Sequence, residues 1–460
     1  MNDNDLISLA NEIAGEKENI RQAIVTAGVA CPEDTPLVQY AGKISQIQNR
    51  VTDAGTEIFY KGTDSTLTQE STTYTVPTTY AAVAPSGLSG YANLQAVTMQ
   101  NVTAVMDSAF AGNKNLTSIT APLCKYYGAN ALVDTGLSGA YTNSAAEYFG
   151  AGCFQNNTKI TSFDLANAKY IGGSCFEGCN KVTTINIPKA VSLGNRCFVN
   201  FANNVYDGSA ALQKWSLSAP LVKSVGCEVA NGNSALNNFE LPNAETIGRY
   251  AFYNCVNLSS INLPSVKSVD ESAFAFNNAK TCDDVYLPAC ENLGYRALQN
   301  RWFKKLTVKD GCYIGSQAYS TTSSSTTSSG SRPLEQIIGK PSYVGAYAFY
   351  YCNALTDVDL SACTFIDEYA FASSSLHVID LSSCTQINNY AFNELSYAQA
   401  KIWLPSTCVT LKDRAIYSNS SNSIRVYTDV ADASSRPASW SNVSRVTWVY
   451  GSSYEDFLAA

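Results

Sequence analysis

Few residues of this chain have the types and spacing that catalysis requires. His377 is the only histidine among 460 residues, so a serine or cysteine nucleophile that needs an imidazole base would depend on it. The two GLSG segments, Gly87–Gly90 and Gly136–Gly139, are one residue shorter than the Gly-x-Ser-x-Gly turn that exposes a catalytic serine. His377 follows Leu376 at an outward position of an expected strand. We therefore expect a solvated histidine and no enzyme activity.

Two pairs of carboxylates stand close together in the sequence. Asp283 is followed by Asp284, and Asp357 is separated from Asp359 by one residue. Such pairs could serve a glycosidase or bind calcium. Neither pair has the spacing of an aspartate-rich calcium loop, and charged residues are common on a solvated sheet. We expect no metal and no cofactor.

The fifteen cysteines follow a structural pattern rather than a metal-binding one. Zinc is not expected, because the chain has no Cys-x-x-Cys pair and a single histidine. Instead, cysteines share columns with alanine or valine in a repeating pattern, which is typical of small buried side chains. Cys153, Cys175 and Cys197 precede an aromatic column, whereas Cys179 and Cys255 follow it by three residues. So many free thiols fit folding in a reducing cytosol.

The segment at residues 247–263, IGRYAFYNCVNLSSINL, is the template of this repeat. The position of its Phe252 recurs at intervals of 22 residues over the first part of the chain and continues with small insertions to about residue 416. The members of this Phe column are Phe110, Leu132, Phe154, Phe176, Phe198, Ala230, Phe252, Phe274, Leu298, Tyr319, Phe349, Phe371, Phe392 and Ile416. Such a period indicates a solenoid, in which each unit buries its apolar face against its neighbours.

The spacing within one unit predicts its local structure. Ile261 and Leu263 are expected to point inward from a short strand that leaves Asn262 outside, with Pro264 ending it. A second extended segment contains Val269. Ser272 to Phe274 are expected to form a tight helical turn, and a recurring glycine, Gly248 here, to provide a positive φ or close packing at a corner.

Units of the form IGxxAFxxCxxLxxIxLPxxV, as at residues 247–266, resemble the leucine-rich repeats of the BspA-like surface-antigen type. The resemblance covers about two thirds of the chain. It implies an extracellular adhesion or binding scaffold, usually without catalysis, of a type that occurs on bacterial surfaces, in parasites and in phage particles. The predicted fold is a repeat solenoid, mainly β with short helical turns, plus a small α-helical N-terminal module.

Residues 1–50 have a different pattern from the repeats. Leu6, Leu9 and Ile13 share one helical face, and Thr35 with Pro36 has the form of a helix start. The segment at residues 18–47 resembles short N-terminal modules of phage tail and other virion proteins, which implies attachment to a particle. An unrelated helical cap is the open alternative. The expected domains are a helical anchoring or oligomerisation module (1–50), a Thr/Ser-rich linker and N-terminal cap (51–93), the solenoid (94–426) and a C-terminal cap (427–460).

Composition excludes some classes of partner. The formal net charge is -8 and the sequence has no basic run, which argues against binding nucleic acid. No apolar stretch is long enough for a membrane helix. The start of the chain also lacks the pattern of a secretory signal peptide. A virion component released by lysis would fit this combination.

Candidate binding residues are the outward positions of the expected strands and an aromatic insertion near Trp302. A sheet exposed to water must be polar in any case, so each residue has an ordinary structural explanation as well. The candidates are Thr183, Asn186, Asn238, Glu240, Ser260, Asn262, Asp284, Tyr286, Trp302, Asp357 and Asp359. Insertions at 200–212 and 319–333 are expected to form loops on one face.

Two functional hypotheses follow. The first is a non-catalytic virion protein of a phage tail or fibre. Residues 1–50 would bind other virion proteins, a homo-oligomer is expected, and the solenoid would meet a host surface glycan or protein. The alternative is a bacterial cell-surface or secreted adhesin with the same solenoid, located outside the cell rather than in a virion.

Overall fold

The computed structural model describes residues 59–60, 65–202, 214–277, 280–320, 333–395, 399–418, 424–443 and 445–460. The chain divides into two compact units, Met1–Val222 and Lys223–Ala460. The helical module expected at 1–50, the greater part of the 200–212 insertion and the Ser/Thr run at 321–332 lie outside the described residues.

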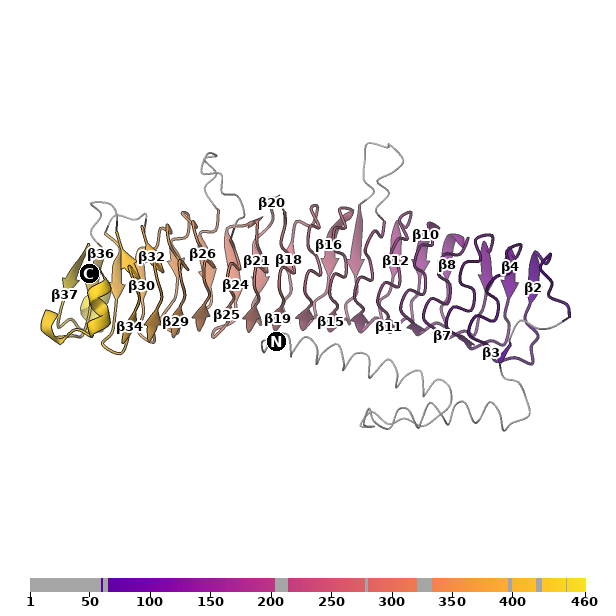
Figure 1. Cartoon of the computed structure of the whole chain (residues 1–460), viewed down its shortest axis with the longest axis horizontal. Helices are drawn as coiled ribbons and strands as arrows, with labels where there is room; N and C mark the ends of the chain where they lie inside the picture. The colour runs from indigo at the N-terminus through magenta and orange to yellow at the C-terminus, as the bar shows by residue number, and fades with distance from the viewer. Residues whose placement is uncertain are drawn as a thin grey trace, which may run out of the picture. The chain divides into compact units, whose positions relative to one another are not determined.

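The described part of the first unit is a stack of coils joined by parallel strands (Figure 1). One narrow sheet takes a two-residue strand from each coil in chain order. These are β1 (Phe59–Tyr60), β3 (Ala82–Val83), β5 (Ala104–Val105), β7 (Tyr126–Tyr127), β9 (Tyr148–Phe149), β11 (Tyr170–Ile171) and β13 (Ser192–Leu193). The other side of the coils carries β2 (Thr73–Thr75), β4 (Ala96–Thr98), β6 (Ser118–Thr120), β8 (Ser138–Thr142), β10 (Lys159–Asp164), β12 (Thr184–Asn186) and β14 (Trp215–Ser218).

The second unit repeats this plan. Its narrow sheet contains β15 (Ser224–Val225), β17 (Thr246–Ile247), β19 (Ser268–Val269), β22 (Asn292–Leu293), β25 (Tyr313–Ile314), β27 (Tyr343–Val344), β29 (Phe365–Ile366), β31 (Gln386–Ile387) and β34 (Thr410–Leu411). A five-stranded sheet orders β18 (Ile261–Asn262), β21 (Val285–Leu287), β24 (Lys305–Val308), β26 (Gln336–Ile338) and β28 (Asp357–Val358). A four-stranded sheet follows, with β30 (Val378–Asp380), β33 (Lys401–Trp403), β36 (Ile424–Tyr427) and β37 (Val446–Val449).

Smaller elements complete the second unit. They are β16 (Leu236–Glu240), β20 (Lys280–Thr281), β23 (Arg301–Trp302), β32 (Phe392–Asn393), β35 (Ile416–Tyr417), the 3-10 helices η2 (Ala433–Ser435) and η3 (Ala438–Asn442), and the helix α3 (Tyr454–Ala459). In the first unit, β1 pairs with β3 and β2 with β4 in the parallel manner of later coils. Coil stacking therefore begins within residues 51–93, the segment expected to be a linker and N-terminal cap.

The solenoid core is the predicted one. All fourteen members of the Phe column are buried, from Phe110 to Ile416. Ile261 and Leu263 are fully buried while Asn262 is exposed, which confirms the alternation. Because inward residues of successive coils meet directly, rings stack along the column. Phe252 and Phe274, for example, have centroids 5.3 Å apart and planes 8° apart.

The turn before each column residue differs from the prediction. Ser272 has a φ of 53° and the segment is not helical. The N–H groups of Ser272 and Phe274 donate to Tyr295 and Ala297 of the next coil, each at 2.9 Å. A helical turn would use such N–H groups within itself, so they could not bond to the next coil. The same left-handed position recurs at Ser108, Asn130, Gly152, Ser174, Arg196, Glu228, Tyr250, Arg296, Gln317, Tyr347, Tyr369, Tyr390 and Arg414.

The recurring glycine is needed for close packing at the corner and does not have a positive φ. A Cβ atom added to Gly248 would lie 2.7 Å from the backbone of Gly226, and one added to Gly345 would lie 2.5 Å from the nitrogen of Ser316. The narrow sheet brings successive coils so close here that a side chain has no space.

Twelve of the fourteen described cysteines are buried, as the repeat pattern predicted, and Cys227 and Cys282 are half-buried. Some of the buried thiols also donate hydrogen bonds. None of the fourteen described cysteines forms a disulfide. Cys255 Sγ donates to the Ala230 carbonyl at 3.1 Å, and Asn157 Nδ2, at the same repeat position, donates to the Leu132 carbonyl at 2.8 Å. Cysteine and asparagine therefore exchange here as donors to the preceding coil. Burial raises the pKa of Cys255 to about 12, so this thiol stays protonated and unreactive.

The C-terminal end contains one element that the sequence did not predict. Strands β36 and β37 pair in parallel at the end of the four-stranded sheet. Helix α3, the only α-helix among the described residues, packs Phe457 against Trp403 and Tyr427 on the outer side of this sheet. A capping box of Ser453 and Asp456 begins the helix.

Candidate functional site

The outer face of the five-stranded sheet in the second unit brings several predicted residues together. The β18–β21 register places Asn262 beside Tyr286, and the β21–β24 register places Tyr286 beside Thr307. Asn262 is exposed, and Tyr286 is 47% exposed. Ser260, just before β18, is half-buried. Asn262 and Tyr286 thus give this face an amide and a phenol side by side.

Carboxylates on this face link neighbouring coils. Asp284 Oδ1 accepts the backbone N–H groups of Lys304 and Lys305 at 3.1 and 2.9 Å. Asp357 Oδ2 accepts from Gln336 Nε2 at 2.6 Å. Both carboxylates are exposed, but these contacts fix one oxygen of each to the adjacent coil. Their first role is therefore to hold the strand register.

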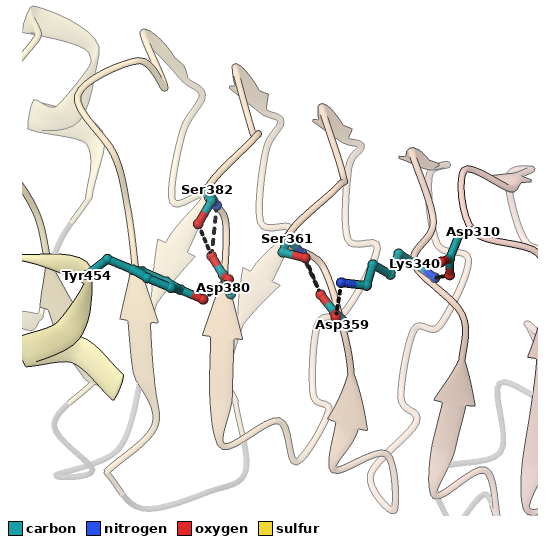
Figure 2. A network of polar contacts seen from close by, with 7 residues as sticks. All are labelled: Asp310, Lys340, Asp359, Ser361, Asp380, Ser382 and Tyr454. Atoms are coloured by element: carbon teal, nitrogen blue, oxygen red, sulfur yellow. Dashed lines mark hydrogen bonds and ion pairs between the residues drawn. The ribbon is translucent and has the colours of Figure 1, made fainter. Parts of the chain in front are cut away.

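Asp359 belongs to a polar network along the coils (Figure 2). Its Oδ2 lies 3.0 Å from Lys340 Nζ, and Ser361 donates to its other oxygen. Burial alone would raise the pKa of Asp359, but the hydrogen bonds from Ser361 and the charge of Lys340 together lower it below its ordinary value. The Lys340 backbone N–H donates to Asp310 at 3.0 Å.

The network continues to the C-terminal helix (Figure 2). Asp380 accepts the Ser382 N–H at 2.9 Å and the hydroxyl of Tyr454, which comes from α3. The hydrogen bond to Asp380, together with burial, raises the pKa of Tyr454 to about 12. Asp359 is therefore bound by the Lys340 ammonium and Ser361, and Asp380 by Ser382 and the Tyr454 hydroxyl. Among the residues that the structure describes, no three His, Cys, Asp or Glu side chains are grouped to hold a metal ion.

The remaining predicted residues lie elsewhere. Asn238 is half-buried and Glu240 exposed, both in β16. In the first unit, Thr183 Oγ1 donates to the Thr161 carbonyl at 3.2 Å, and Asn186 Nδ2 donates to Asp164 Oδ1 at 2.8 Å. These two side chains already bond to the preceding coil, as expected of a solvated sheet.

Trp302 does not join the strand face. It lies in β23, which pairs with β20 rather than with the five-stranded sheet. The indole is half-buried, and its N–H is buried without an acceptor among the described residues. Beside it, Arg301 is fully buried and donates to the carbonyls of Phe274 and Leu258 at 2.8 and 2.7 Å. This insertion therefore consolidates the coil interior.

Sequence reasoning missed the stacked aromatic residues outside the core. In the first unit, Tyr126 and Tyr148 stack with centroids 4.7 Å apart. In the second, Tyr313 and Tyr343 stack at 4.4 Å and Tyr343 and Phe365 at 5.0 Å. The signal was present in the sequence, because each aromatic recurs at the first position of successive narrow strands, six residues before the Phe column.

No described helix is long and apolar enough to span a bilayer. Comparison with curated proteins finds no match. Among solved structures, a leucine-rich repeat protein from Bacteroides ovatus is 16% identical, with a TM-score of 0.46, over 82% of this chain and 83% of that one. A leucine rich cell surface protein from Faecalibacterium prausnitzii is 14% identical, with a TM-score of 0.34, over 85% of this chain and 90% of that one.

The sequence profile of the BspA type leucine rich repeat region matches residues 86–205, 200–326 and 333–437. These segments include the whole Phe column from Phe110 to Ile416. The chain belongs to the BspA type leucine rich repeat family.

Proposed function

We propose that this chain is a non-catalytic adhesin, a leucine-rich repeat protein that works outside the cell and binds a surface glycan or protein. The observation that carries the proposal is the outer face of the five-stranded sheet, where Asn262 and the exposed Tyr286 stand side by side on adjacent strands. Exposed tyrosine beside amide and hydroxyl groups is the chemistry of many recognition surfaces.

Several acidic and thiol groups of the second unit have structural roles. Asp284, Asp357 and Asp359 bond to neighbouring coils, and the buried thiol of Cys255 has a raised pKa. The stacked sheet fixes the backbone positions of Asn262 and Tyr286 relative to each other, so the backbone of this surface needs no reordering when a ligand arrives.

The test is a paired substitution on this face. Ligands would be identified with arrays of surface glycans and proteins, and affinities measured by biolayer interferometry with the full chain. Asn262→Ala combined with Tyr286→Ala should weaken binding roughly tenfold or more, which corresponds to about 1.4 kcal/mol. Val409→Ala, at a residue 60% exposed and outside this sheet, is the matched control and should leave affinity unchanged. Unaltered binding by the double variant at unchanged stability would remove this face from the proposal.

A finer assignment, to a phage tail or fibre, rests on the helical pattern of residues 1–50 and stays a prediction. In that case residues 1–50 attach the chain to other virion proteins and hold a homo-oligomer. Light scattering of the full chain and of a variant lacking residues 1–50 would test it. The virion hypothesis expects an oligomer that the deletion converts to a monomer, whereas a full-length monomer would count against it.

A further inference from the structure

Three tyrosines occupy consecutive left-handed turn positions in the second unit. Tyr347, Tyr369 and Tyr390 have φ values of 57°, 53° and 57°. The same position is held elsewhere by Gly152 and Asn130, the residue types that tolerate this conformation best. Serine, arginine, glutamate and glutamine also hold this position in other coils, so the conformation belongs to the repeat. What distinguishes these three coils is that they are consecutive and an aromatic ring occupies the position in each of them. We call these three residues the tyrosine ladder.

The rings of the tyrosine ladder stack along the coil axis. Tyr347 and Tyr369 have centroids 5.0 Å apart at 17°, and Tyr369 and Tyr390 have centroids 4.8 Å apart at 8°. Tyr350 stands nearly perpendicular to both Tyr347 and Tyr369, at 82° and 81°. Tyr351, which is 44% exposed, packs against Tyr350 at 4.3 Å. Five tyrosines therefore form one half-exposed aromatic surface.

The stacking decides which part of each ring a ligand can meet. Neighbouring rings cover one another's faces, so ring edges and hydroxyl groups remain for contact. Burial, reinforced by nearby Glu368, raises the pKa of Tyr347 and of Tyr369, so both hydroxyls stay protonated at neutral pH and can donate as well as accept. Charges of both signs border the ladder. Tyr390 donates to Asp413 at 3.3 Å, and the Arg414 guanidinium lies 5.8 Å from the Tyr390 ring. Because both an acidic and a basic side chain lie beside the ladder, a neutral ligand is favoured over a charged one.

The spacing of the ladder selects the class of ligand. Its hydroxyl-bearing rings recur every 4.8 to 5.0 Å. An extended peptide advances by about 3.3 Å per residue, so side chains on the same face are about 6.6 Å apart. This distance matches neither the spacing of adjacent ladder rings nor twice that spacing. A linear hexose polymer advances by nearly the same distance per sugar as this ladder does per ring.

We propose that the tyrosine ladder binds a neutral, extended oligosaccharide that lies along the coil axis, with one sugar opposite each tyrosine. The inference rests on the proposed binding function but uses a different surface from the Asn262 and Tyr286 face. Tyr350 and Tyr351 widen the contact, while the ladder hydroxyls exchange hydrogen bonds with sugar hydroxyls. Three rings limit the footprint to three or four sugars.

The test uses the full-length chain and linear cello-, chito- and manno-oligosaccharides of two to six sugars, measured by isothermal titration calorimetry. Affinity for at least one series should rise from disaccharide to tetrasaccharide and then level off. The triple variant Tyr347→Asn, Tyr369→Asn and Tyr390→Asn should bind about tenfold more weakly or worse. It should keep its fold, because Asn130 already adopts this conformation at the same repeat position. Tyr369→Phe, which keeps the stack and removes one hydroxyl, should weaken binding about threefold and covers the case in which the triple variant does not fold.

Other outcomes separate the two surfaces. The Asn262→Ala, Tyr286→Ala variant should keep oligosaccharide binding. If it loses all binding while the triple variant keeps it, the ladder proposal fails and the proposed function stands. Absence of binding by every series, or equal affinity in parent and triple variant, overturns the ladder proposal. The parent chain could also self-associate in sedimentation experiments while the triple variant alone does not. This result would identify a second copy of the chain as the occupant of the ladder and would overturn the ladder proposal as well.

Discussion

Replacing Phe252 by alanine should remove a central part of the second unit's core. The side chain is fully buried, and its ring stacks on Phe274 at 5.3 Å and on Phe239 at 5.0 Å. Truncation of a buried phenylalanine costs about 3–5 kcal/mol. The lost ring pairs account for about 0.5–1.5 kcal/mol each beyond area burial, so the upper half of that range is expected. Each coil is stabilised by its neighbours, so the defect should also weaken the adjacent coils.

Urea denaturation of the full-length chain, followed by far-UV circular dichroism, measures this cost. Phe252→Leu is the matched substitution, because Leu132 and Leu298 occupy the same buried column, and it should cost less than about 1.5 kcal/mol. Asn262→Ala, ten residues later on the exposed face, should stay within about 0.5 kcal/mol. Equal losses for Phe252→Ala and Asn262→Ala would show that the inward and outward sides of the coil are assigned the wrong way round.

Three further substitutions test separate features. Gly345→Ala should cost about 1–3 kcal/mol by overpacking in urea denaturation, because its Cβ would lie 2.5 Å from the Ser316 nitrogen; a variant as stable as the parent would contradict the close approach. Burial raises the pKa of Asp270 in the folded chain, and the hydrogen bond from Ser268 offsets this shift only in part. As pH rises, the carboxyl therefore ionises in the unfolded chain before it does in the folded chain. The free energy of unfolding falls until the pH has passed the pKa of the folded chain. Asp270→Asn should therefore be more stable than the parent at pH 7 and lose this advantage near pH 3, whereas a pH-independent difference would exclude the carboxyl as its source. Phe457→Ala should undock α3 and expose Trp403, seen as a red shift of tryptophan fluorescence; an unchanged spectrum would show that the helix is held by other contacts.

Apolar spacing was sufficient to predict the core. A column of mainly aromatic and aliphatic residues that recurs about once per coil can be buried together only if the coils stack in register, and all members from Phe110 to Ile416 are buried. Alternation also identified Asn262 as outward and Ile261 as inward. Both predictions use the side-chain period of a strand, which depends on the local chain alone.

The turn conformation could not be predicted in this way. Ser272, Tyr250 and Arg296 share a left-handed backbone although none of them favours it. Hydrogen bonds to the next coil impose that conformation, such as the 3.0 Å bond from the Tyr250 N–H to Glu271. Helix α3 was missed for a related reason. Six residues give little helical signal, and Phe457 is held by tertiary packing on Trp403 and Tyr427.

The sequence predicted which side chains of the candidate site are exposed, but it did not predict their hydrogen-bond partners. Asp284 and Asp357 are outward, yet their partners Lys305 and Gln336 are 21 residues away and become neighbours only through stacking. Trp302 was placed among the binding residues because of its aromatic and basic surroundings. It lies in β23, which pairs with β20 and not with the five-stranded sheet, and its role in binding stays a prediction.

The central claim is that successive coils stack along one axis within the second unit, and distances between spin labels test it most directly. Labels introduced as unnatural amino acids at Ser224, Tyr313 and Thr410 avoid the native cysteines and occupy first positions of narrow strands. Strand order places Tyr313 four steps and Thr410 eight steps from Ser224. At about 4.8 Å per step, the backbone separations should be about 19 Å and about 38 Å, so the second distance is twice the first. Two similar distances, both near the shorter value, would contradict the stacked architecture and the binding surfaces built on it.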